Sequence, residues 1–242
     1  MLEQYFEIET DDNFLIYGVL NSEIKSDRLL IFVHGLTGEK ENHLYYNGAR
    51  FFPALGIDTV RFDLFSNHKR GRSLTHCAIS TFADDLTRVI QNFHNDYAEI
   101  HIVGHSIGGC AAMNADLSQV TSLVLWDCSL YVQGQDDSHF AYSEYFDCYI
   151  AHLKIEYFLS RQLINERRQQ NEQVVAKVTR PIKLIFAGNS KVHQSWATAL
   201  SSITVNHAVT SIEGASHGFN EYGVDKPLFE ETLQWLQLEH TA

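Results

Sequence analysis

Short apolar runs alternate with amphipathic segments along most of the chain. Residues 28–34 form a nearly continuous apolar run, as expected for a strand that is buried on both faces of a sheet. Residues 58–64, 99–105, 121–127 and 181–187 predict four further strands. Two earlier runs, 4–9 and 14–20, flank an Asp-Asp-Asn turn and predict an antiparallel hairpin, and residues 204–213 predict a last strand.

The segments between these strands have helical character. In residues 81–97, apolar side chains recur at the spacing of one face of a helix. Similar patterns predict helices over 42–55, 108–117, 193–200 and 227–238. Strands that alternate with helices build a mostly parallel sheet with helices on both faces. We therefore expect an α/β fold with a mostly parallel eight-stranded sheet, in one domain over residues 1–242.

Residues 129–180 interrupt this alternation. The segment lies after the sixth predicted strand and is rich in Tyr, Phe, Arg and Gln. A crossover between parallel strands needs only about a dozen residues, so we expect part of this segment to form a small helical cap. Its aromatic side chains either contact an apolar or aromatic group of a substrate or form the packing core of the cap itself.

The charge balance narrows the choice of partners. The chain carries 30 acidic against 18 basic residues, for a formal net charge of −12. Proteins that bind nucleic acids or anionic membranes present basic patches, so neither is an expected partner. No apolar run approaches the ~18–20 residues of a membrane span. We expect a monomer or a homodimer.

The cysteines and the N-terminal stretch indicate the compartment. None of the four cysteines forms a CxxC pair, and a domain of this size needs no disulfide to hold its core. The first residues, MLEQYFEIETDD, have neither the basic nor the apolar region of a signal peptide. We therefore expect a cytoplasmic protein with reduced thiols.

The sequence GHSIGG at residues 104–109 is the strongest indication of chemistry. It matches G-x-S-x-G and lies between a predicted strand and a predicted helix. Such a turn holds the serine in a strained backbone conformation, with its hydroxyl above the sheet. The flanking glycines remove Cβ atoms that would collide there. Ser106 is the candidate nucleophile, and a tight turn without chemistry is the alternative.

A serine that attacks an acyl group also needs hydrogen-bond donors for the developing oxyanion. One donor is the amide after the serine, here that of Ile107. The other comes from the loop after an earlier strand, and the sequence HGLTG at residues 34–38 follows the run LLIFV. The amide of Leu36 is the candidate, unless this is an ordinary glycine-rich turn.

Thirteen histidines compete for the role of base. His217 lies in EGASHGF, after the last predicted strand and before the last predicted helix. In folds with this elbow the histidine follows the serine and the acid along the chain, so His217 is the candidate base. The alternative is a histidine on a surface loop. His105, beside the nucleophile, is expected to be a packing residue.

Taken in order, HGLTG, VRFDL, GHSIGG and EGASHGF resemble the motifs of serine esterases of the α/β-hydrolase fold. The resemblance spans residues 28 to 238 and is greatest to the cinnamoyl/feruloyl esterase and monoacylglycerol-lipase-like branch. It implies the α/β-hydrolase fold, a catalytic triad, a small-molecule ester or acyl substrate and no cofactor.

The chain departs from that branch at the acid of the triad. Its members usually carry an aspartate just after the penultimate strand, where this chain reads AGNSKVH and has Ser190 or Lys191 at the expected place. Some lipases and dehalogenases of this fold place the acid one strand earlier, and Asp127 occupies that position here. The alternatives are Asn189 or Ser190 as a neutral partner of the histidine, or no third member.

Together these residues predict serine-dependent hydrolysis of a small carboxylic ester through an acyl-enzyme. The histidines lack the spacing of a helical metal site, so no metal is expected. Two other interpretations stay open. One is an acyl-thioesterase or acyltransferase, for which the myristoyl-ACP thioesterases are a loose parallel. The other is a degraded hydrolase fold that binds a ligand without turning it over.

Overall fold

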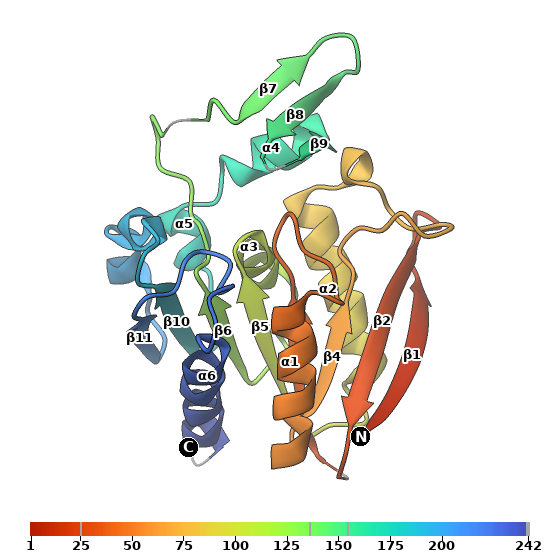
Figure 1. The fold of residues 1–242 in the computed structure, drawn as a ribbon, viewed down its shortest axis with the longest axis vertical. Coiled ribbons are helices and arrows are strands. Elements are labelled where there is room, and N and C mark those ends of the chain that lie inside the picture. The colour runs from red at the N-terminus through yellow and green to blue at the C-terminus, as the bar shows by residue number, and fades with distance from the viewer. Residues whose placement is uncertain (25, 136, 154, 241–242) are drawn as a thin grey trace.

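A single large sheet forms the centre of the molecule (Figure 1). The computed structural model describes residues 1–24, 26–135, 137–153 and 155–240. In spatial order, the strands of this sheet are β1 (Leu2–Glu9), β2 (Leu15–Ser22), β4 (Asp58–Phe62), β3 (Arg28–Val33), β5 (Glu99–His105), β6 (Ser122–Trp126), β10 (Ile182–Ala187) and β11 (His207–Ile212). Only β2 pairs antiparallel with its neighbours, so the predicted eight-stranded, mostly parallel sheet is confirmed.

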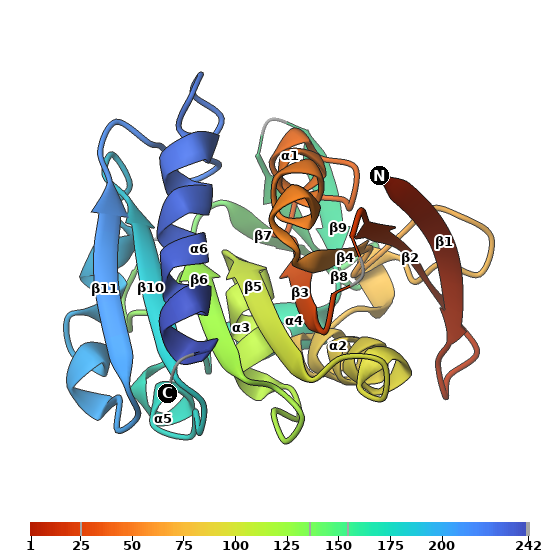
Figure 2. The same cartoon turned by 90° about the horizontal axis from the view of Figure 1, so that it is seen from below.

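Helices cover both faces of this sheet (Figure 2). The helices are α1 (His43–Phe51), α2 (Ile79–Phe93), α3 (Ile107–Asn114), α4 (Arg161–Arg167), α5 (Glu172–Val175) and α6 (Asp225–His240). Side chains of α1 and α6 share one buried cluster, and those of α2 and α3 share another. Each cluster lies on its own face of the sheet, which explains why the central strands are apolar throughout.

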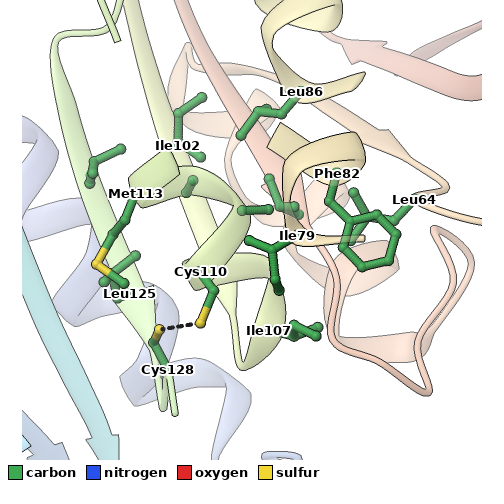
Figure 3. Close-up of a cluster of buried hydrophobic side chains, with 14 of the residues drawn as sticks. Leu64, Ile79, Phe82, Leu86, Ile102, Ile107, Cys110, Met113, Leu125 and Cys128 are labelled. Carbon is green, nitrogen blue, oxygen red and sulfur yellow. Dashed lines mark hydrogen bonds between the residues drawn. The ribbon is translucent and has the colours of Figure 1, made fainter. Parts of the chain in front are cut away.

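Figure 3 shows part of the larger cluster. Ile79, Phe82 and Leu86 recur at helical spacing along α2 and are buried. They face α3, which contributes Cys110 and Met113 to the same cluster. An apolar stripe of this kind anchors a helix on its sheet. The packing fixes α3, the helix that begins directly after the predicted nucleophile.

The segment between β6 and β10 differs from the expected cap. Its second half contains α4 and α5, but its first half forms a separate antiparallel sheet. The strands of this sheet are β7 (Phe140–Ser143), β8 (Cys148–His152) and β9 (Glu156–Leu159). Aromatic side chains fit a pleated, half-buried surface, and Phe140, Ala151 and Tyr157 lie opposite one another across the three strands. Part of the segment is helical, as predicted, whereas the three strands of its first half were not predicted.

The cap leaves and rejoins the main sheet at neighbouring places, because β6 and β10 pair directly. At its base, the amide of Tyr131 donates a hydrogen bond of 2.7 Å to the carbonyl of Gln170. In Figure 1 the cap sheet lies above α3, beyond the ends of β5 and β6. The cap is thus placed over the edge of the sheet where the predicted site residues gather.

A second difference concerns the chain after β10. Residues 193–200 were expected to be α-helical, but two 3₁₀ turns, Val192–Trp196 and Ala199–Ser202, cover this stretch. The hydroxyl of Ser195 donates to the carbonyl of Val192, and this short-range bond competes with an α-helical arrangement. None of the helices in the described parts of the chain is long and apolar enough to cross a membrane.

Candidate active site

Ser106 lies at the sharp turn between β5 and α3. Its φ of 54° and ψ of −123° are in a region that costs a non-glycine residue of order 1–3 kcal/mol. The turn also requires glycine on both sides. A Cβ on Gly104 would lie 2.6 Å from the Cα of Gly109, and a Cβ on Gly108 would lie 2.4 Å from the carbonyl oxygen of Val33. The strand, the strained serine and the helix form the expected elbow.

The loop between β11 and α6 carries His217 to this serine. His217 Nε2 is 2.9 Å from Ser106 Oγ, and His217 Nδ1 is 2.7 Å from Asp127 Oδ2. A carboxylate only accepts hydrogen bonds, so Nδ1 carries the proton of the neutral ring. Nε2 is therefore free to accept a hydrogen bond from the serine hydroxyl, which is the arrangement that a general base needs.

Asp127 directly follows β6, and its side chain is fully buried. Its second oxygen, Oδ1, accepts a hydrogen bond of 3.1 Å from the amide of Ala187, at the end of β10. The two other candidate partners of the histidine bind elsewhere. Asn189 donates to the carbonyl of Gly214, and Ser190 Oγ accepts from the amide of Val192. The structure therefore brings Asp127 to His217, and neither Asn189 nor Ser190.

The loop after β3 lies against the serine. A Cβ on Gly35 would be 3.3 Å from Ser106 Cβ, so this loop passes within van der Waals distance of the elbow. The amides of Leu36 and Ile107, the two candidate donors, have no hydrogen-bond acceptor among the described residues. Both N–H groups are therefore free to donate to a bound molecule.

His34 controls the direction of one of these amides. Its Nδ1 lies 2.8 Å from the carbonyl oxygen of Gly35, and its Nε2 accepts a hydrogen bond of 2.9 Å from the amide of Leu64. The proton must therefore be on Nδ1, and burial lowers the pKa of His34, which favours this neutral form. Because a trans peptide points its C=O and N–H in opposite directions, holding the Gly35 carbonyl also sets the Leu36 amide. The sequence reasoning missed this role.

His105, the residue before the nucleophile, is also buried and hydrogen-bonded. Its Nε2 lies 2.7 Å from the carbonyl oxygen of His217. Burial, with a smaller contribution from the nearby His217 ring, lowers the pKa of His105 from 6.5 to about 4. His105 is thus neutral at neutral pH.

This pKa predicts that the protein loses stability in mild acid. The unfolded state binds a proton on His105 near pH 6.5, but the folded state does not until about pH 4, so this contribution is present above pH 6.5 and is lost as the pH falls toward 4. Between pH 7.5 and 5 the free energy of unfolding should drop by about 2 kcal/mol through this group. Urea unfolding at both pH values measures the drop. His105→Gln should show a smaller one, and equal drops in the two proteins would contradict the assignment.

Two hollows border the loop that carries Leu36. The smaller, about 210 Å³, is lined by residues of this loop, by the first residues of α1, and by Gly218 and Asn220. The larger, about 500 Å³, shares Thr37 and Gly38 with it and extends to Tyr157 of β9. Of the two, the larger falls within the roughly 300–1,000 Å³ that small-molecule sites usually have.

The cap aromatics divide between packing and solvent. Phe140, Tyr149 and Tyr157 pack against the main core, whereas Tyr145 is 88% exposed and Phe146 is 56% exposed. Tyr157 therefore serves both the core and the wall of the larger hollow. In the part of the chain that the structure describes, no group of three or more His, Cys, Asp or Glu side chains could hold a metal ion.

Comparisons with known proteins agree with this architecture. The model of the alpha/beta hydrolase family matches residues 30–227. Est1E from Butyrivibrio proteoclasticus, solved with ferulic acid bound, is similar over 98% of this chain and 100% of its own, with a TM-score of 0.79 at 14% identity. The esterase domain of a Rhodothermus marinus protein is similar over 97% and 98%, with a TM-score of 0.74 at 16% identity. The alpha/beta hydrolase GrgF from Penicillium sp. sh18 is similar over 100% of both chains, with a TM-score of 0.80 at 13% identity. No curated protein matches this chain.

Proposed function

This chain belongs to the alpha/beta hydrolase family, and we therefore propose that it hydrolyses a small carboxylic ester with Ser106 as its nucleophile. One observation supports the proposal above all others. Ser106, His217 and Asp127 form a continuous line of hydrogen bonds of 2.9 and 2.7 Å, with the carboxylate at the buried end. This arrangement of a hydroxyl, an imidazole and a carboxylate is the one that makes a serine nucleophilic.

The proposed reaction has two halves. His217 Nε2 takes the proton of Ser106 as Oγ bonds to the ester carbonyl carbon, and the carbonyl electrons move onto the oxygen. The amides of Leu36 and Ile107 donate to that oxyanion. When the C–O bond to the alcohol breaks, His217 gives its proton to the leaving oxygen, and an acyl-enzyme remains. Water then enters, loses a proton to His217 and bonds to the acyl carbon. When the bond from that carbon to Ser106 Oγ breaks, His217 returns the proton to Oγ, and the carboxylic acid leaves.

The position of Asp127 weakens the case for a non-catalytic ligand receptor. That alternative was motivated by the missing carboxylate after the penultimate strand. A buried carboxylate at 2.7 Å from His217 Nδ1 can stabilise the imidazolium that forms in each half-reaction. The proposed active site therefore lacks none of the groups that acyl transfer needs.

We expect oxygen esters to be better substrates than thioesters. The test is a panel of p-nitrophenyl esters, feruloyl esters and acyl-CoA thioesters with matched acyl chains, assayed against wild type and Ser106→Ala. The preferred oxygen ester should show a kcat/KM at least about tenfold above that of its matched thioester, roughly 1.4 kcal/mol of transition-state discrimination. Feruloyl esters are included because ferulic acid is bound in the similar Est1E structure.

Other outcomes of the panel identify the alternatives. A higher kcat/KM for the acyl-CoA compounds would indicate a thioesterase or acyltransferase. Turnover of none of them, together with no reaction of Ser106 with a fluorophosphonate, would favour the receptor.

A further inference from the structure

Behind the proposed active site, one chain of hydrogen bonds joins two of its loops. Tyr45 Oη, on α1, accepts a hydrogen bond of 3.3 Å from the amide of Gly35. The same oxygen lies 3.0 Å from His105 Nδ1. At the far end, His105 Nε2 lies 2.7 Å from the carbonyl oxygen of His217. The chain runs from the loop beside Leu36 to the loop that carries the proposed base.

The groups at the two ends of this chain determine which atom donates and which accepts in each of its hydrogen bonds. A carbonyl oxygen can only accept, so His105 Nε2 must carry the ring proton. His105 Nδ1 is then an acceptor, and the Tyr45 hydroxyl donates to it. The amide of Gly35 donates to the remaining lone pair of Tyr45 Oη. Every donor in the chain therefore meets an acceptor.

Burial makes these bonds costly to lose. The exposed fractions of Tyr45 and His105 are 3% and 8%, so water can hardly replace a missing partner. Burial also raises the pKa of Tyr45 and lowers that of His105, and both residues stay neutral at neutral pH. A neutral His105 fits this pattern, because a proton on Nδ1 would remove the lone pair that accepts from the Tyr45 hydroxyl.

The attachment points make the chain relevant to the proposed catalysis. Among the described residues, the bond from His105 is the one hydrogen bond that the backbone of His217 makes. At the other end of the hydrogen-bond chain is the amide of Gly35, and the next amide along the backbone is that of Leu36. A shift of a reacting group by about 1 Å can lower a rate about 10²-fold, so holding these two backbones matters for the rate.

We propose that Tyr45 and His105 are positioning residues. Through this shared hydrogen-bond chain, they hold the loop that carries His217 and the loop that carries Leu36 in fixed positions relative to each other. The inference rests on the proposed function. Neither side chain is hydrogen-bonded to Ser106 Oγ or His217 Nε2, which bond to each other, so both residues act through the backbones that they hold. Their contribution should therefore appear in kcat and leave KM nearly unchanged.

The test compares three substitutions with a matched control. Tyr45→Phe removes one oxygen atom. His105→Leu removes both ring nitrogens and puts an apolar side chain in their place. Each should lower kcat for the preferred ester by about 10–100-fold, with KM within about threefold of wild type. His105→Gln keeps a donor close to the position of Nε2 and should recover a large part of the kcat lost in His105→Leu.

Tyr97→Phe is the matched control. The Tyr97 hydroxyl donates a hydrogen bond of 2.8 Å to Asp58 at the start of β4, at the opposite end of the strands from Ser106. This variant loses a hydroxyl and a hydrogen bond as Tyr45→Phe does, and its kcat should stay within about twofold of wild type. A loss of kcat in Tyr97→Phe equal to that in Tyr45→Phe would point to general destabilisation and overturn the proposal.

The design separates failure of this inference from failure of the proposed function. If Ser106→Ala abolishes turnover while folded Tyr45→Phe keeps kcat within twofold of wild type, the positioning role is wrong and the function stands. If Ser106→Ala leaves turnover intact, the proposed function itself is wrong. Thermal unfolding of each variant shows whether it is folded, and Tyr45→Phe alone decides the question if His105→Leu does not fold.

Discussion

Replacing Ser106 by alanine is expected to lower kcat/KM for the preferred ester by about 10⁴–10⁶-fold. The substitution removes the hydroxyl oxygen that lies 2.9 Å from His217 Nε2. Without this oxygen no acyl-enzyme can form. The residual rate would come from direct attack of water on the ester carbonyl carbon, with the oxyanion donors stabilising the charge on its oxygen. Ester hydrolysis by the purified variant measures the loss, and a fluorophosphonate should label wild type but not the variant.

Ser190→Ala is the control for this prediction. Ser190 follows β10, and its hydroxyl accepts a hydrogen bond from the amide of Val192 in its own turn. Its removal should leave kcat/KM within about threefold of wild type. A Ser106→Ala protein that keeps a tenth or more of the wild-type rate would rule out the proposed nucleophile.

Replacing Asp127 by asparagine is expected to lower kcat by about 10²–10⁴-fold. The reason lies in the two partners of the carboxylate. Its Oδ1 accepts from the amide of Ala187, so the amide oxygen of an asparagine would take that place. The asparagine NH₂ group would then face His217 Nδ1, and the ring would have to carry its proton on Nε2. In that tautomer His217 cannot accept the proton of Ser106.

Asn189→Ala gives the matching control, since Asn189 stands near the position where the related esterases usually carry their acid. Its side chain donates to the carbonyl of Gly214 and does not contact His217. We expect its kcat to stay within about threefold of wild type. An active Asp127→Asn protein beside an inactive Asn189→Ala protein would transfer the role of the third member to the loop after β10.

The local parts of this site could be predicted from the sequence because neighbouring residues determine them. The elbow depends on Gly104 and Gly108, two positions on either side of Ser106, and on the strand and helix around it. His217 could be placed because a single loop separates the last strand from the last helix. In each case the motif and the geometry lie within a few residues of each other.

The partner of His217 depended on the packing of distant strands. Asp127 reaches the histidine because β6 and β10 are neighbours and the amide of Ala187 holds its carboxylate. No pattern within the stretch around Asp127 reports that register. The sequence therefore favoured Asp127 but left Asn189, Ser190 or no third member as alternatives.

His34, Tyr45 and His105 could not be assigned from the sequence for a similar reason. Tyr45 and His105 are separated by 60 positions, and His105 and His217 by 112. Hydrogen bonds over such separations have no periodic signature. The sequence suggested only a packing role for His105, the histidine beside the nucleophile. Its hydrogen bonds to Tyr45 and to the carbonyl of His217 show that the ring also has defined polar partners.

The strands of the cap were missed because residues 129–180 were interpreted from length and composition. Apolar Ala141 lies between Phe140 and Tyr142, and apolar Ile150 lies between Tyr149 and Ala151, so no alternation of apolar and polar residues marks these strands. The helical part of the cap, which was expected without bounds, lies at 161–167 and 172–175, where the chain turns back toward β10.

The narrow base of the cap has a consequence for protein engineering. Because the amide of Tyr131 binds the carbonyl of Gln170, the chain between them starts and finishes at nearly the same point in space. A donor segment from another hydrolase could be grafted between these two positions without displacing the main sheet beneath it. Chimeras of this kind would exchange the cap and keep the proposed active site of this chain.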